Sequence, residues 1–166
     1  MTNGHRRLHT PCLSLLVKLL CFISSLGSGG AERQLTTLAV ALKKRGHEVR
    51  FLVYHPEDHF LPLLQAADIP CEVIPPCSHL LRALVVRRIL RQGWQDVVLA
   101  FLEAPCLYAE LAHLPRQKWG LVAGERLADP GLGLGRARWR RQVHRFADAV
   151  VTNSHTNRLM LHNRLP

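Results

Sequence analysis

The feature that most constrains the fold of this chain is a regular alternation between short apolar runs and amphipathic runs. The apolar runs have the length and the branched or aromatic residues of strands that are buried on both faces of a sheet. The amphipathic runs repeat their apolar residues with the period of a helix. Because the alternation recurs about six times with short connections, it predicts a doubly wound, parallel α/β sheet covered by helices on both faces.

The expected elements follow from this pattern. The first helix shows it most clearly, since Leu35, Leu38, Ala39 and Leu42 form one apolar stripe that ends before Gly46. Strands are expected at 15–24, 48–54, 71–74, 96–102, 119–123 and 149–152. Further helices are expected at 58–67, 80–92, 105–113 and 137–146, and a last one begins at 155.

The composition is that of one ordinary globular domain. The chain has 166 residues, of which 48% are hydrophobic and 20% are charged. We expect residues 1–17 to be a poorly ordered N-terminal extension and residues 18–166 to form the folded domain. Two arginines before the apolar run 13–26 imitate a signal peptide, but Lys18 interrupts that run, which favours a buried strand.

The five cysteines indicate neither a disulfide framework nor a zinc site. Their number is odd, their spacing is scattered, and no C-x-x-C occurs. Reduced cysteines that act as small hydrophobic residues are the simpler interpretation, and they favour a cytoplasmic protein.

The charge balance is strongly basic, with a net charge of +10 and a pI near 10.3. Two arginine groups, within 82–91 and within 136–145, carry much of the excess. Such a balance suggests an anionic partner, which leaves nucleic acid, an anionic membrane face and phosphorylated substrates open. A solvated cationic helix face explains either group equally well.

A glycine-rich turn lies between the first expected strand and the first expected helix, with Gly-Ser-Gly-Gly at 27–30. Glycines allow a close approach of the backbone to a ligand, and the free N–H groups at a helix start attract anions. The turn is therefore a candidate phosphate cradle, although it has neither the P-loop nor the dinucleotide-binding spacing. A plain tight turn explains it as well.

The longer segment around this turn narrows the interpretation. The stretch 18–53, KLLCFISSLGSGGAERQLTTLAVALKKRGHEVRFLV, closely resembles the opening of family 4 glycosyltransferases, in its Gly-Gly-Ala-Glu-Arg loop and its Lys-Arg-Gly-His-Glu-Val turn. Three later segments are also similar to that family: QDVVLAFLEAP at 95–105, Gly-Glu-Arg at 124–126 and FADAVVTNSHTNRLML at 146–161.

The resemblance implies the N-terminal, acceptor-side half of a GT-B enzyme, in which two Rossmann-like domains face each other across a cleft. The second domain would bind a UDP- or GDP-linked sugar as substrate, and transfer would retain the anomeric configuration without a metal or another cofactor. Carried over by position, Gly29 and Gly30 would approach the donor phosphates, and Glu32 and Arg33 are the next candidates. Helix-end electrostatics and a solvent-facing pair are the alternative for Glu32 and Arg33.

The resemblance also singles out Glu103, Glu125 and Arg126, which follow two strands at the edge where open α/β sheets bind ligands. Glu103 and Glu125 are the candidate catalytic residues, and Arg126 is a candidate acceptor contact. Many family members have a histidine near Glu103, and this sequence does not. An internal salt bridge is the alternative for Glu125 and Arg126, and we expect two histidines, His113 and His144, to be ordinary helix residues.

The chain ends where the family's polypeptide crosses to its second domain, so we expect the donor-binding domain to be absent and the chain alone to be inactive. A fragment, one subunit of a split transferase and a non-catalytic module all remain open. The alternative function is a non-catalytic anion- or nucleic-acid-binding α/β module. The low aromatic content of 6% and the lack of a nucleic-acid-binding motif argue against nucleic-acid binding.

A membrane is the remaining expected partner. Many related transferases act on lipid-linked acceptors, so a basic helix at 136–145 would hold the protein at the inner face of an anionic membrane. Arg138, Arg140 and Arg141 are the candidates for this contact. Cell-envelope polysaccharide synthesis is the expected setting, and the donor sugar, the acceptor and the pathway stay open.

Overall fold

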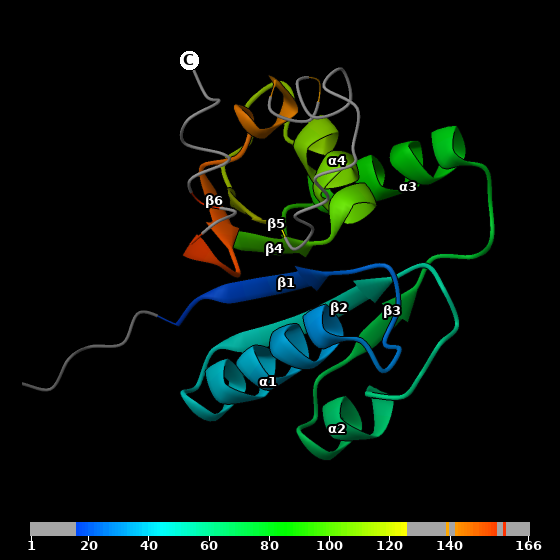
Figure 1. The fold of residues 1–166 in the computed structure, drawn as a ribbon, viewed down its shortest axis with the longest axis vertical. Coiled ribbons are helices and arrows are strands. Elements are labelled where there is room, and N and C mark those ends of the chain that lie inside the picture. Colours follow the sequence, from blue (N-terminus) through cyan, green and yellow to red (C-terminus); the bar gives the residue numbers. More distant parts are fainter. Residues whose placement is uncertain (1–15, 126–138, 140–141, 156–157, 159–166) are drawn as a thin grey trace, which may run out of the picture.

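The fold is a six-stranded, all-parallel sheet with helices on both faces (Figure 1). The computed structural model describes residues 16–125, 139, 142–155 and 158. The strands are β1 (Lys18–Phe22), β2 (Glu48–Val53), β3 (Cys71–Val73), β4 (Val97–Phe101), β5 (Gly120–Glu125) and β6 (Ala149–Thr152). The helices are α1 (Gly30–Lys44), α2 (Leu61–Ala66), α3 (His79–Arg91) and α4 (Glu103–Ala112). The predicted class, a doubly wound α/β sheet, is confirmed.

The strands lie in the order β3-β2-β1-β4-β5-β6. The chain therefore builds the sheet outward from β1 in one direction and then returns to build it outward from β4 in the other. The helices α1 and α2 pack on one face and α3 and α4 on the other, with the sheet between them (Figure 1). The reversal point of such a sheet lies between β1 and β4, and it is where doubly wound folds bind ligands.

Two apolar cores hold the layers together, one on each face of the sheet. On the α3 and α4 side, Phe22 and Leu121 pack with Leu90. On the α1 and α2 side, Cys21 and Phe51 pack with Leu35. Because neighbouring residues of one strand, such as Cys21 and Phe22, contribute to opposite cores, the continuous apolar runs of the sequence are explained.

Local signals place most of the element ends. Gly46, with φ at 91°, ends the turn after α1, where a left-handed backbone favours glycine. Ser78 caps α3, because its hydroxyl oxygen accepts a hydrogen bond from the backbone N–H of Leu81. The helix expected at 58–67 begins at Leu61, three residues later, since a turn bonded from the N–H of Leu61 to the carbonyl of Asp58 precedes it. Of the helix expected at 137–146, residues 137, 138, 140 and 141 lie outside the described residues, and 142–144 are helical.

Candidate functional site

The ends of β1, β4 and β5 bring the candidate residues to one edge of the sheet. These three strands are neighbours and run parallel, so the segments that follow them lie side by side at the carboxyl edge. The glycine loop follows β1, Glu103 follows β4, and Glu125 ends β5. The sequence placed these residues on different strands, and the topology makes them neighbours in the sheet order.

The glycine loop is fastened to the segment after β2. The Ser25 hydroxyl donates a hydrogen bond of 2.8 Å to Glu57 Oε2, and the backbone N–H of Leu26 donates to the Glu57 carbonyl at 3.0 Å. A Cβ atom on Gly27 would lie only 2.5 Å from the same Glu57 carboxylate oxygen. Glycine at 27 thus lets an acidic side chain lie against the loop, and neither Ser25 nor Glu57 was singled out from the sequence.

The open part of the loop is its end, where α1 begins. Gly29 is the N-cap of α1, it makes no side-chain cap, and a Cβ on Gly30 would meet no described atom within 4 Å. Gly29 and Gly30 are both exposed. This helix start therefore presents backbone N–H groups to an open space, which is the arrangement that binds phosphate.

Glu32 occupies part of that space. Its carboxylate lies against Gly29, at the position where a Cβ on Gly29 would be. A negative side chain is stabilised in the first turn of a helix by the helix dipole. The Glu32 carboxylate therefore lies at the positive end of α1, where it would compete with any anion that binds there.

Arg33 lies on a different surface. It lines a shallow depression on the outer side of α1 with Thr37 and Leu38. Its exposure and its place beside solvent-facing helix residues agree with the alternative of a solvent-facing residue. Its bond to the glycine loop is through the backbone, since the Arg33 N–H donates to the Gly29 carbonyl at 3.1 Å.

The junction between β4 and α4 is strained. Leu102 has φ at 75° and ψ at 163°, a backbone conformation that is almost confined to glycine. It nevertheless serves as the N-cap of α4, and Glu103 is the first residue of that helix. The strained residue thus turns the chain so that the half-buried Glu103 starts α4 at the carboxyl edge. Strain of this kind is concentrated at functional sites.

Glu125 belongs to a buried chain of three ionisable side chains. Its Oε2 lies 3.2 Å from His144 Nε2, and His144 Nδ1 lies 2.6 Å from Glu110 Oε1. Glu110 is fully buried in α4, His144 is 5% exposed, and the second oxygen of Glu110 has no hydrogen-bond partner among the described residues. The network joins the last residue of β5 to α4 and to the segment before β6.

Both ring nitrogens of His144 thus face carboxylate oxygens, one from α4 and one from the end of β5. A neutral imidazole can donate from one nitrogen only, so the roles of the two nitrogens depend on the tautomer.

The expectation for the two histidines is therefore met only in part. His113 and His144 do lie on or beside helices, but both are buried and both ring nitrogens of each contact oxygen atoms. Glu110 was not singled out at all, because a glutamate inside an apolar helix pattern gives no signal of its partner 34 residues later. The remaining candidates, Arg126, Arg138, Arg140 and Arg141, lie outside the described residues.

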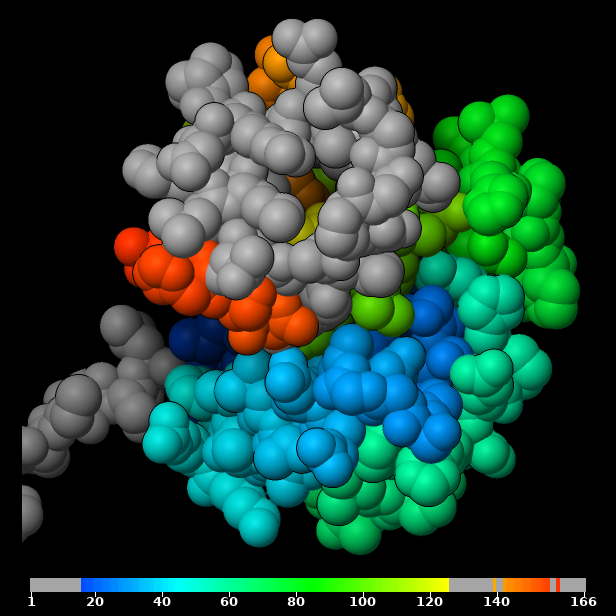
Figure 2. All heavy atoms as spheres, in the orientation of Figure 1, coloured from blue at the N-terminus to red at the C-terminus, as the bar shows by residue number. Residues whose placement is uncertain are grey.

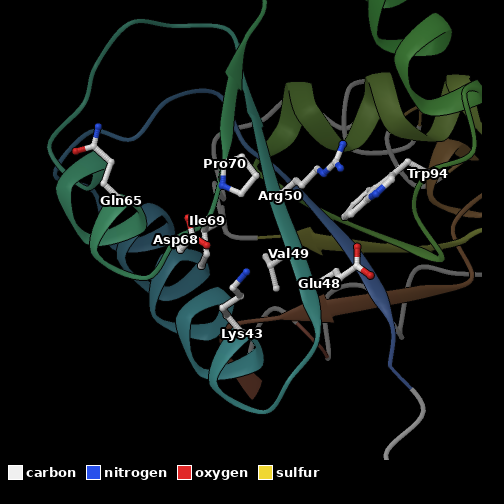
Figure 3. A pocket seen from close by; sticks show the side chains of 9 residues that line it. All are labelled: Lys43, Glu48, Val49, Arg50, Gln65, Asp68, Ile69, Pro70 and Trp94. Atoms are coloured by element: carbon white, nitrogen blue, oxygen red, sulfur yellow. The ribbon is translucent and has the colours of Figure 1, made fainter.

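A second concavity lies at the opposite, amino edge of the sheet (Figure 3). It encloses about 520 Å³ between the end of α1, the start of β2 and the turns before β3 and β4. The guanidinium of Arg50 lies 4.0 Å above the centre of the Trp94 ring. Lys43 and Arg50 contribute positive charge, and Glu48 and Asp68 contribute negative charge, so the lining has no net formal charge.

Burial raises the pKa of three groups in or beside the sheet, the Cys21 thiol among them. Burial, and then the neighbouring Tyr108, raises the pKa of Tyr54 to about 12, against an opposing effect of Arg82. The Arg82 guanidinium lies 4.3 Å above the Tyr54 ring and donates to the Cys77 carbonyl, so this arginine is buried and does not belong to the exposed basic face of α3. Burial also raises the pKa of the Cys71 thiol to about 11.

The cysteines within the described part of the chain are all free thiols. Among the same residues no group of three or more His, Cys, Asp or Glu side chains is placed to hold a metal ion. None of the described helices is long and apolar enough to cross a membrane.

The parallel sheet with its open glycine loop has the fold of the N-terminal, Rossmann-like domain of GT-B glycosyltransferases. The model of glycosyltransferase family 4 matches residues 28–166, and the chain belongs to this family. The chain is 30% identical, over 107 residues, to the GalNAc-α-(1→4)-GalNAc-α-(1→3)-diNAcBac-PP-undecaprenol α-1,4-N-acetyl-D-galactosaminyltransferase of Campylobacter jejuni. The matched segment covers 58% of this chain and 30% of the Campylobacter protein.

Two solved structures are similar in fold. The Anabaena protein HepE, in complex with UDP and glucose, superposes with a TM-score of 0.69 at 22% identity, over 89% of this chain and 41% of its own. A glycosyltransferase from Rickettsia africae superposes with a TM-score of 0.67 at 16% identity, over 88% of this chain and 39% of its own. The chain thus spans less than half the length of these relatives.

Proposed function

We propose that this chain is the acceptor-side half of a retaining transferase that moves a sugar from a nucleotide-sugar donor to a glycan or lipid-linked acceptor. The observation that carries the proposal is the open start of α1 at Gly29 and Gly30, which lies at the reversal point of the sheet and presents backbone N–H groups to an anion. Membership of family 4 supports the same reaction class.

In this proposal the glycine loop stabilises the diphosphate that leaves the donor sugar. Fixed backbone dipoles aimed at developing negative charge are among the strongest contributions to catalysis. Glu103 and Glu125 would face the acceptor from the ends of β4 and β5, where their carboxylates contact its hydroxyl groups. Arg126 would extend this contact on the same edge.

The proposed substrates follow the relatives. The Anabaena structure contains UDP and glucose, and the Campylobacter enzyme is named for a lipid-linked glycan acceptor. We infer a UDP- or GDP-sugar as donor and a glycan, either free or on a lipid diphosphate, as acceptor. A lipid-linked acceptor places the protein at the cytoplasmic face of a membrane, and Arg138, Arg140 and Arg141 remain candidates for contact with it.

We further propose that this chain alone lacks turnover, because leaving-group stabilisation also needs a donor-binding half from the same or another polypeptide. The test incubates the chain, with and without a family 4 donor-binding domain, with labelled UDP- and GDP-sugars and an undecaprenyl-diphosphate-linked glycan. Transfer is expected only with both halves, with the new linkage in the donor's anomeric configuration by NMR. Robust turnover by the chain alone contradicts the division of labour, and an inverted product contradicts the retaining mechanism.

A further inference from the structure

The loop after β1 and the segment after β2 are held together as one unit by backbone hydrogen bonds. The carbonyl oxygen of Ser24 accepts bonds from the N–H groups of Tyr54 and His55, at 3.1 and 2.9 Å. The carbonyl of Leu26 accepts another, at 2.9 Å, from the N–H of Phe60. In Figure 2 the blue residues that follow β1 and the blue-green residues that follow β2 lie against each other at the surface. The glycine loop therefore has a fixed support on this side.

One side-chain contact within this unit involves a carboxylate. The hydroxyl of Ser25, a residue that is only 5% exposed, donates a hydrogen bond of 2.8 Å to Glu57 Oε2. The same hydroxyl oxygen accepts a longer bond, of 3.4 Å, from the backbone N–H of Gly27. Hydrogen bonds to ionised acceptors are the stronger ones. The Glu57 carboxylate therefore orients a nearly buried hydroxyl group, which in turn contacts the first glycine of the loop.

The charge of Glu57 does not explain its place beside the loop. A negative side chain near a phosphate cradle weakens the binding of an anion. Glu57 is exposed, and none of the ion pairs between described residues involves it. Gly27 is not among the described glycines with positive φ, so its missing side chain provides room for the carboxylate and not an unusual backbone. The hydrogen bond to Ser25 is thus the contact that the glutamate contributes here.

We propose that Glu57 is a positioning residue of the donor site, which acts through Ser25 to hold the glycine loop in the form that binds a diphosphate. The inference rests on the function proposed above, and it assigns no contact between Glu57 and the substrate. A loop that is in place before the ligand arrives loses less conformational entropy on binding, and its N–H groups need no reorganisation as charge develops. The carboxylate therefore strengthens anion binding through geometry, whereas its charge weakens it.

The test measures the binding of inorganic pyrophosphate to the purified chain by isothermal titration calorimetry. Ser25→Ala is expected to weaken the binding about fivefold, the effect of one lost hydrogen bond. Glu57→Ala is expected to weaken it about threefold, because the loss of its negative charge offsets part of the effect. Glu57→Gln removes the charge but keeps an acceptor oxygen for the Ser25 hydroxyl, so it is expected to bind at least as tightly as wild type.

The matched control is Asp58→Asn. Asp58 is the neighbouring exposed carboxylate, and its side chain makes no hydrogen bond among the described residues, so the control is expected to bind no more weakly than wild type. Amide hydrogen exchange by NMR adds a readout that needs no ligand. The N–H groups of Leu26 and Gly27 are expected to exchange about tenfold faster in Ser25→Ala and Glu57→Ala, and at the wild-type rate in Glu57→Gln and Asp58→Asn.

The direction of the change decides the outcome. Equal or tighter pyrophosphate binding by Glu57→Ala overturns the proposal, because the carboxylate then acts through its charge alone. Unchanged amide exchange in both alanine variants overturns it as well, as does a wild-type chain that binds no pyrophosphate. Together with a donor-binding half, the alanine variants are expected to raise the KM for the donor and not for the acceptor.

The two proposals fail in different ways. Pyrophosphate binding that depends on Ser25 and Glu57, without sugar transfer by the wild-type chain and a donor-binding half, contradicts only the proposed function. Transfer with an unchanged KM for the donor in both alanine variants contradicts only this inference.

Discussion

The two edges of the sheet differ in how their polar groups are held. At the amino edge, a concavity of about 520 Å³ carries two positive and two negative side chains at the surface, and their formal charges cancel. At the carboxyl edge, the start of α1 is open and uncapped, Leu102 is strained, and a buried network holds Glu125. The two edges therefore differ in chemistry: the carboxyl edge combines backbone strain with a buried ionisable network, features that are concentrated at functional sites, whereas the amino edge has only an open hollow.

The largest expected effect is on the free energy of unfolding, when a buried side chain at one edge and an exposed one at the other are each replaced by alanine. His144→Ala is expected to lower the free energy of unfolding by about 3–5 kcal/mol, because it leaves the buried Glu110 carboxylate without its partner. Arg50→Ala at the amino edge is expected to lower it by about 0.5–1 kcal/mol, the contribution of its contact with Trp94. Urea denaturation of both variants measures the difference, and equal values contradict a special role for the network.

The next prediction uses alanine substitutions at two glycines to separate an effect on sugar transfer from an effect on stability. Gly30→Ala adds a methyl group in open space on a helical backbone, so the chain is expected to be more stable by about 0.5–1 kcal/mol. The same methyl group hinders the approach of a diphosphate, and transfer by the complete enzyme is expected to fall about a hundredfold.

Gly93→Ala at the amino edge is the matched control. Gly93 has φ at 72°, so alanine there is expected to destabilise the chain by about 1–2 kcal/mol and to leave transfer by the folded enzyme unchanged. Thermal unfolding and a transfer assay on both variants decide the point. Full transfer activity of Gly30→Ala would contradict a role of the glycine loop in binding the donor.

The smallest expected effect concerns the strain at Leu102. Glycine is usually less favourable than alanine in a folded chain, yet here Leu102→Gly is expected to be more stable than Leu102→Ala by roughly 1 kcal/mol. Both variants lose the same leucine side chain, so their difference reports the backbone alone. A more stable alanine variant in chemical denaturation means that the junction between β4 and α4 is not strained.

The sequence predicts the fold well because strand and helix periods are local. The apolar stripe of Leu35 and Ala39, and the glycine at 46, place α1 and its end without knowledge of any other element. The order of the strands, which brings the segments after β1 and β4 and the end of β5 to one edge of the sheet, follows only from the doubly wound class.

The buried network escapes such reasoning because its contacts are long-range. Glu110 and His144 are 34 residues apart, and His144 and Glu125 are 19 residues apart. The burial of Arg82 was missed for a similar reason, since its aromatic partner Tyr54 belongs to the preceding half of the sheet. Periodicity reports which residues of one element share a face, but not which side chain of a distant element meets them.

The contact between β4 and β5 has a consequence for the history of this sequence. A Cβ atom at Gly124 would lie 2.5 Å from the Phe101 ring, so the two positions share one volume. A larger residue at 124 is therefore expected to require a smaller residue at 101 or a shift of the Phe101 ring, because the added methyl group and the ring would overlap. Descendants and relatives should therefore vary at these two positions together, and the Gly-Glu-Arg motif depends on an aromatic residue that lies outside it.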